Sequence, residues 1–182
     1  MTHYGPRPVG SYECDVQTVA YLRSVLTSLV SRQPQARVRM EVDTQLVSGT
    51  FHLRGYDLYQ KYEDVTNIVV RLSNSSQQAG VKPAVLGNQV TFCAILIFFV
   101  AVNCHFDSVP MGPGASDDAV SCGVMLEIIR VMVTSPRTSL TNDLIFLFNG
   151  AEEVILTGSH GFITKHKWAD TIRVCPLCLT RL

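Results

Sequence analysis

Charged residues are scarce in this chain of 182 amino acids, at 16% of the sequence, and neither sign of charge predominates. The 15 basic residues balance the 15 acidic residues, so the formal net charge is zero. The sequence also lacks any basic run, and it lacks the interleaving of basic with aromatic residues that is typical of nucleic-acid interfaces. We therefore expect no nucleic-acid partner.

Targeting and membrane segments are also missing from the sequence. Residues 1–6 have neither a basic start nor an apolar core, so we expect no signal peptide in this chain. The longest uncharged apolar run, from Val90 to Val102, is shorter than the roughly 20 residues that a membrane helix needs. A buried strand is the favoured interpretation of this run, and a marginal membrane segment is the alternative.

Metal or redox spacing is rare among the six cysteines. Only Cys175 and Cys178 form a C-x-x-C pair, and a single pair without a partner pair is weak evidence for a zinc or redox site. We interpret this pair as part of an incidental tail. The others are expected to be small core residues, with a disulfide left open as an alternative: Cys14, Cys93, Cys104 and Cys122.

Hydrophobic residues make up 47% of the chain, which is enough to bury the core of one domain. Their periodicity predicts helices at residues 15–31, 117–133 and 158–173, and strands at residues 37–44, 66–72 and 144–148. The buried stripe expected on the second helix is Val120, Val124, Ile128 and Val131. This order of elements predicts an α/β fold, with a mixed central β-sheet flanked by helices on both faces.

Three short acidic clusters stand out against the low overall charge. They lie at residues 103–107, 113–119 and 149–153, and each follows or opens a strongly apolar stretch. Ligand sites in open α/β sheets lie beyond the carboxyl ends of strands, so we expect the three clusters to share one site. Carboxylates that converge without cations raise one another's pKa values, and a pair of divalent metal ions is the natural compensation. The sequence therefore predicts a two-metal hydrolase site.

Each cluster taken alone also has a simpler explanation. His105 and Asp107 would face the same side of an extended segment, as a metal-bound histidine and its supporting carboxylate do. A surface histidine beside a capping aspartate would give the same pattern. The aspartate pair at 117–118 could cap a helix, and the glutamate pair at 152–153 could form an acidic first helical turn. The coincidence of all three clusters at element ends favours the shared site.

These residues resemble a known family, the co-catalytic di-zinc aminopeptidases, which are zinc-dependent exopeptidases of metallopeptidase family twenty-eight. The resemblance rests on His105-Phe106-Asp107, on Gly114 to Asp118 and on Glu152-Glu153. The sequence looks in particular like the endoplasmic-reticulum metallopeptidase branch, over about residues 4–173. Further matching segments are Gly5-Pro6-Arg7-Pro8, residues 66–70, residues 146–153 and residues 159–162.

The resemblance implies a zinc-exopeptidase fold and the removal of N-terminal amino acids from peptide substrates, with two Zn²⁺ ions as cofactors. Asp117 would bridge the two ions, next to a cis peptide bond that follows it. Glu152 would be the general base that deprotonates a bridging water, and Asp107 would orient the histidine ligand. The implied metal ligands are His105, Asp117 and Glu153.

The sequence also departs from the family pattern. The family has a further carboxylate ligand and a final histidine, and neither has a counterpart before the sequence stops at Leu182. Residues 87–101 look like an insert and residues 174–182 like an atypical tail. We therefore expect residues 1–182 to be a single, C-terminally incomplete peptidase domain, truncated or alternatively spliced, that is inactive by itself. The resemblance implies a full-length parent that is a membrane protein with this domain in the endoplasmic-reticulum lumen.

Two other functions stay open. A non-catalytic interaction module could keep the same fold, and the missing ligands favour this alternative. A single-zinc transferase similar to glutaminyl cyclase is the second alternative. The pair His105 and Asp107 argues against it, because in the family that pair serves the second metal. Metal content would separate the three functions, since the peptidase implies two zinc ions per chain, the transferase one and the interaction module none.

Overall fold

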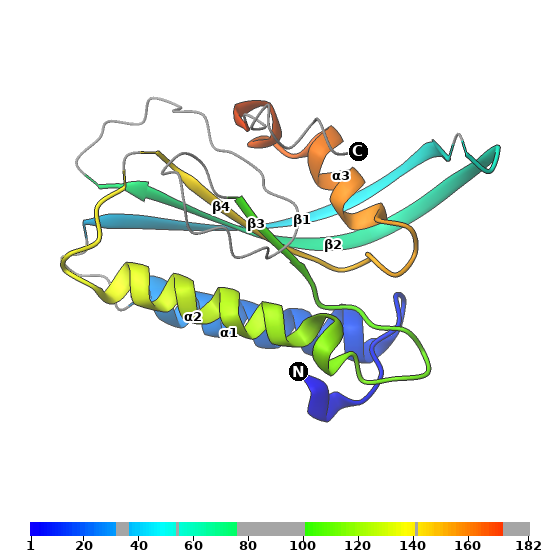
Figure 1. Ribbon diagram of the computed structural model, residues 1–182, viewed down its shortest axis with the longest axis horizontal. Helices are drawn as coiled ribbons and strands as arrows, with labels where there is room; N and C mark the ends of the chain where they lie inside the picture. The colour runs from blue at the N-terminus through cyan, green and yellow to red at the C-terminus, as the bar shows by residue number, and fades with distance from the viewer. Residues whose placement is uncertain (32–36, 54, 76–100, 141, 173–182) are drawn as a thin grey trace.

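A mixed four-stranded β-sheet lies at the centre of the computed structural model, which describes residues 1–31, 37–53, 55–75, 101–140 and 142–172 (Figure 1). The strand order within these residues is β1-β2-β4-β3. β2 pairs antiparallel with β1 on one side and with β4 on the other, and β3 pairs parallel with β4. The strand bounds are β1 Val38–Leu53, β2 Leu58–Asn74, β3 Ala101–His105 and β4 Leu144–Asn149.

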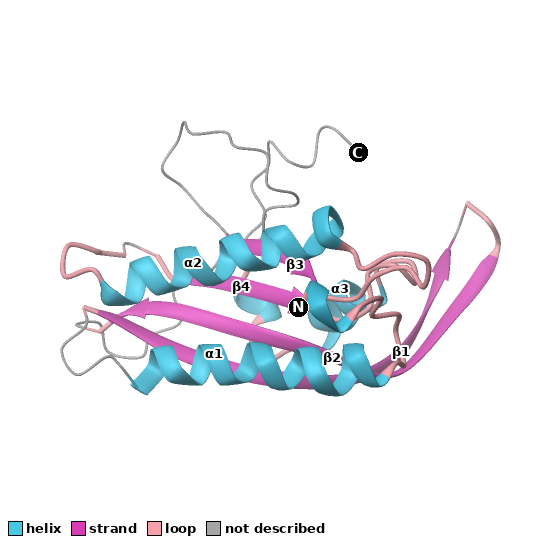
Figure 2. Cartoon of the chain, turned by 90° about the horizontal axis from the view of Figure 1, so that it is seen from below, coloured by secondary structure: helices cyan, strands magenta, loops and turns pink. Residues whose placement is uncertain are grey.

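Helices cover both faces of this sheet. α1 (Val19–Ser31) and α2 (Val120–Thr134) lie side by side on one face, and α3 (Thr157–Lys165) lies on the other (Figures 1 and 2). The strands alternate accordingly, since Ile68 belongs to the core beneath α1 and α2 whereas its neighbour Val69 packs with residues on the α3 side. The predicted α/β fold with a mixed sheet and helices on both faces is confirmed.

Several elements differ in length from their predictions. β1 and β2 continue beyond residues 37–44 and 66–72 as a hairpin that projects past the rest of the sheet, with a bulge between Val47 and Gly49 (Figure 1). A π-helical turn, Glu13–Thr18, precedes α1. The helix predicted at 158–173 ends at Lys165, and a short 3₁₀ turn follows at Ala169–Thr171. It ends there because the next residue, His166, is extended and its Nδ1 accepts the Trp168 N–H at 3.1 Å.

The buried stripe predicted for α2 is wrong. Its members are exposed by 39% to 56%: Val120, Val124, Ile128 and Val131. The opposite face is buried instead, and its residues are Cys122, Met125, Ile129 and Val133. Because both faces carry apolar residues at helical spacing, periodicity alone did not decide which of them packs on the sheet.

Some predictions fall on residues outside the described part of the chain. They concern the tail at 174–182, the insert and apolar run up to residue 100, and Cys93, Cys175 and Cys178. The other three cysteines, Cys14, Cys104 and Cys122, are buried free thiols, as predicted for small core residues. None of the helices within the described ranges is long and apolar enough to cross a membrane.

Candidate metal centre

The three acidic clusters meet at one end of the sheet. β3 and β4 run parallel and end together, so that His105, the last residue of β3, pairs with Asn149, the last residue of β4. Glu152 and Glu153 lie in the turn that directly follows β4. Asp117 comes from the π-helical turn Ala115–Ala119 that precedes α2, and its Oδ1 lies 3.0 Å from His105 Nε2.

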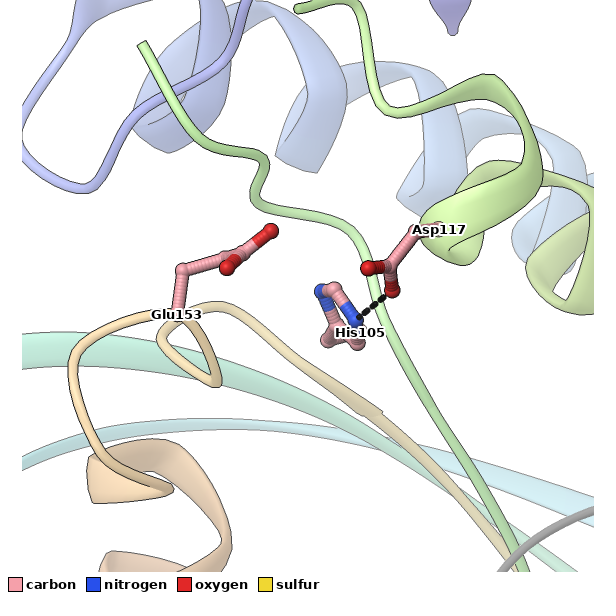
Figure 3. Close-up of side chains that lie close together, drawn as sticks. All are labelled: His105, Asp117 and Glu153. Carbon is pink, nitrogen blue, oxygen red and sulfur yellow. Dashed lines mark hydrogen bonds and ion pairs between the residues drawn. The ribbon is translucent and has the colours of Figure 1, made fainter. Parts of the chain in front are cut away.

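His105, Asp117 and Glu153 form a triangle of possible metal ligands. Each presents one ligand atom, and these atoms lie within 4.8 Å of one another. Figure 3 shows the three side chains, from three separate segments, pointing toward one shared space. One imidazole and two carboxylates form a donor set that zinc binds in proteins. The residues present at this place therefore fit a zinc ion.

Asp107 connects the first cluster to the third. Its side chain is fully buried, and its two carboxylate oxygens accept the backbone N–H groups of Glu152 at 3.1 Å and Glu153 at 3.0 Å. His105 Nδ1 lies 3.2 Å from the Asp107 carbonyl oxygen and 3.4 Å from its Oδ1. Because Nδ1 faces Asp107, Nε2 is the ring nitrogen that faces Asp117.

The second cluster approaches His105 through an unusual backbone. The peptide bond between Asp117 and Asp118 is cis, as the resemblance implied, and Asp118 Oδ2 accepts the His105 backbone N–H at 3.3 Å. Gly114, before the turn, has a φ of +53°. A Cβ at Gly114 would come within 2.6 Å of the Asp117 carbonyl oxygen, so only glycine fits here without moving the aspartate.

The surrounding carboxylates change the protonation of His105. Burial alone would lower its pKa, but the hydrogen bond and charge of Asp107, together with Glu152 and Asp117, raise the pKa of His105 to about 9. Burial also raises the pKa of Glu152, the charge of His105 opposes this, and nearby carboxylates including Glu153 add to it. Without a metal, His105 is therefore cationic at neutral pH, and a metal ion would displace that proton.

The simpler explanations of the clusters do not describe this arrangement. His105 and Asp107 are 7% and 0% exposed, so they are not a surface pair. No side-chain capping bond forms at the 115–119 turn or at the start of α2. The first turn of α3, which begins at Thr157, contains no acidic residue.

Sequence analysis gave no site role to two polar residues that support this region. Asn149 Nδ2 donates to Asn103 Oδ1 at 2.8 Å and to the Cys104 carbonyl oxygen at 3.1 Å, which ties together the ends of β3 and β4. Arg7 is fully buried and donates to the Phe106 carbonyl oxygen at 2.9 Å. The sequence feature that could have indicated a role for Arg7 is its position in a turn-rich segment that contains few other residues suited to burial.

Comparison with a solved structure shows the class of fold. The chain resembles the crystal structure of the LapA aminopeptidase of Legionella pneumophila with a TM-score of 0.63, over 95% of this chain and 37% of that one. The sequence identity is 19%, so the likeness is one of fold. The chain therefore shares the α/β fold of that solved structure, and its possible metal ligands lie around the ends of β3 and β4.

Sequence comparisons show the family. The description "Peptidase family M28", a family of zinc-dependent peptidases, matches residues 98–176. The chain is 47% identical to "Endoplasmic reticulum metallopeptidase 1" of Rattus norvegicus and 44% identical to that of Homo sapiens, over 95% of its length in each case. It spans 17% of the length of these two relatives. A shorter segment is 46% identical, over 63 residues, to a "Vacuolar membrane protease" of Fusarium vanettenii. The chain belongs to peptidase family M28, in the branch of the endoplasmic-reticulum metallopeptidases, and is a metallopeptidase by lineage.

Proposed function

We propose that the cluster at the strand ends is the metal site of a zinc aminopeptidase, which removes N-terminal amino acids from peptides. One observation carries the proposal: the ligand atoms of His105, Asp117 and Glu153 lie within 4.8 Å of one another. A further carboxylate, that of Glu152, lies beside this triangle, with Oε2 3.8 Å from His105 Nε2. A metal-ligand set with an adjacent carboxylate suits hydrolysis of a peptide bond.

We assign two zinc ions to the site. His105 and Asp117 would hold one ion, and Asp117 and Glu153 would hold the other. Asp117 suits the shared role because its side chain is 80% exposed and offers two oxygens. The bound metal pair would supply Lewis acidity, which polarises a carbonyl group and lowers the pKa of a water molecule.

The remaining two residues of the site would act on protons. Asp107 would accept a hydrogen bond from His105 Nδ1–H, which keeps the proton on Nδ1 and leaves Nε2 free to bind metal. Glu152 is assigned as the general base, because its carboxylate faces the ligands without belonging to the triangle. Its raised pKa suits a group that takes up a proton and then passes it to the leaving amine.

Two metal ions would share few ligands at this site. Among the described residues, each ion of the assigned pair has two protein ligands, whereas catalytic zinc sites typically have three. We therefore expect the 182-residue chain to bind zinc weakly and to show little turnover by itself. A non-catalytic role would follow if the chain binds no zinc at all.

A site with a single zinc ion is the second candidate. The triangle of His105, Asp117 and Glu153 by itself provides the three protein ligands that one catalytic zinc needs. This alternative would suit a transferase of the glutaminyl-cyclase kind. The number of zinc ions bound per chain distinguishes it from the two-zinc peptidase.

The names of the relatives support the cellular part of the proposal. Relatives similar over 95% of this chain are named after the endoplasmic reticulum. The relative named "Vacuolar membrane protease" supports only the membrane-bound part of the proposal. We propose that the domain acts on peptides in the lumen of the endoplasmic reticulum, as part of a membrane-bound parent protein.

Two adjacent glutamates provide a matched test of the proposed function. Glu153→Gln removes a ligand, so zinc affinity measured by isothermal titration calorimetry should fall by about 100-fold or more. Glu152→Gln should keep zinc affinity within about threefold. In a chain extended so that each ion gains a third protein ligand, it should reduce zinc-dependent cleavage of an aminoacyl chromogenic substrate by about 100-fold. Equal losses of affinity in the two variants would contradict these separate roles. A wild-type chain that binds no zinc would contradict the proposal itself.

A further inference from the structure

Arg7 is a fully buried arginine whose guanidinium nitrogens donate to backbone carbonyl groups. Nε donates to Phe106 O at 2.9 Å, Nη1 to Pro113 O at 2.7 Å and to Gly5 O at 3.1 Å, and Nη2 to Gly114 O at 3.5 Å. Burying a guanidinium is costly unless its N–H groups are satisfied, and the carbonyls provide that satisfaction here. Arg7 therefore acts mainly through the geometry of its donors.

Three of the four carbonyl groups that Arg7 binds lie next to the two segments that carry His105 and Asp117. Phe106 directly follows the ligand His105, whereas Pro113 and Gly114 lie directly before the turn that carries Asp117. One rigid, planar group thus contacts the loop at its beginning and at its end.

The main chain of Arg7 holds the middle of the same loop. Its N–H donates to Ser108 Oγ at 2.8 Å, and the Ser108 N–H donates back to the Arg7 carbonyl oxygen at 3.0 Å. Ser108 Oγ also lies 3.0 Å from the Gly112 carbonyl oxygen, to which it can donate. The segment 106–114 is therefore attached to Arg7 at its start, middle and end.

We propose that Arg7 is a positioning residue of the metal site, which sets the separation of His105 and Asp117 through the loop 106–114. This inference rests on the proposed function, because it assumes that these two residues bind metal. A lysine cannot replace the arginine, since one ammonium group lacks the planar set of donors that reaches several carbonyls at fixed angles.

Cobalt(II) titration of the 182-residue chain tests this role, because the visible absorption of bound cobalt reports both affinity and ligand geometry. Arg7→Lys should lower cobalt affinity at least tenfold and change the shape of the absorption band. Arg71→Lys is the matched control. Arg71 is a half-buried arginine of β2 that pairs with Asp143 at the opposite end of β4, with Nε at 2.9 Å from Oδ2. It should lower the melting temperature while keeping cobalt affinity within about twofold.

The outcomes separate the inference from the proposed function. A wild-type chain that binds no cobalt overturns both. A wild-type chain that binds cobalt, together with an Arg7→Lys variant of equal affinity and spectrum, overturns the positioning role alone. Equal losses of affinity in Arg7→Lys and Arg71→Lys also overturn it, because general destabilisation would then explain the effect.

A milder variant covers the case in which Arg7→Lys does not fold. Ser108→Ala removes the acceptor for the Arg7 N–H and leaves the guanidinium contacts in place. Cobalt affinity should then fall about threefold or more, and the absorption band should shift. Unchanged affinity in a folded Ser108→Ala chain would overturn the inference.

Discussion

The candidate metal centre has a buried half and an exposed half, which are held in different ways. His105 and Asp107 are 7% and 0% exposed, and hydrogen bonds tie Asp107 to the backbone of the turn after β4. The side chain of Asp117 is 80% exposed and reaches the site through its contact with His105. The difference indicates that folding holds the buried half in place, and we propose that the exposed half is completed only when a cation neutralises its charge.

The largest expected effect is a loss of fold stability in the buried half. Asp107→Ala would leave the backbone N–H groups of Glu152 and Glu153 without their acceptor, and would remove the carboxylate that lies 3.4 Å from His105 Nδ1. We expect the free energy of unfolding of the metal-free chain to fall by about 3 kcal/mol, measured by urea denaturation. A loss of less than about 1 kcal/mol would show that these bonds do not hold the buried half together.

Protonation of His105 should give the stability of the metal-free fold and the affinity for zinc opposite pH dependence. Its pKa in the metal-free fold, about 9, is above the ordinary value of 6.5, so the folded state binds the proton more tightly than the unfolded chain does. The resulting stability is complete below pH 6.5 and is lost as the pH rises through 9. At most it amounts to about 3 kcal/mol. Zinc affinity should rise over the same pH window, since the metal needs a neutral imidazole.

Urea denaturation of the metal-free chain at about pH 6 and about pH 9.5 checks this pH dependence. His105→Gln is the control, because other groups that titrate in this range are common to both chains. The difference in stability between the wild-type chain and the variant should shrink as the pH rises. A difference that grows with pH would contradict the raised pKa of His105.

Much of the fold was predictable because strand and helix periods differ. Leu144 to Phe148 is a continuous apolar run, and it forms the central strand β4, buried on both faces. The orientation of α2 was not predictable, since Val124 and Met125 are both apolar and only packing on the sheet buries Met125. The projecting hairpin of β1 and β2 was missed because exposed residues such as Leu46 and Tyr59 break the alternation expected of a half-buried strand.

The position of the candidate site was predictable, but its support was not. Acidic clusters after two apolar strands indicate a shared place, because parallel strands end at the same edge of a sheet. Which of two adjacent carboxylates enters the ligand triangle depends on the backbone of the turn, which periodicity does not describe. The contacts of Arg7 join residues about 100 positions apart, and the sequence showed no pattern that connects them.

Zinc titration of the wild-type chain and of Asp117→Asn, with bound zinc counted by mass spectrometry, tests whether Asp117 is the shared metal ligand of the site. We expect the wild-type chain to bind zinc and the variant to lose it, with affinity lower by about 100-fold or more. The urea midpoint of the metal-free variant should stay close to that of the wild-type chain, because Asp117 is exposed. One tightly bound zinc ion retained by Asp117→Asn would contradict the claim that Asp117 is the shared ligand of the site.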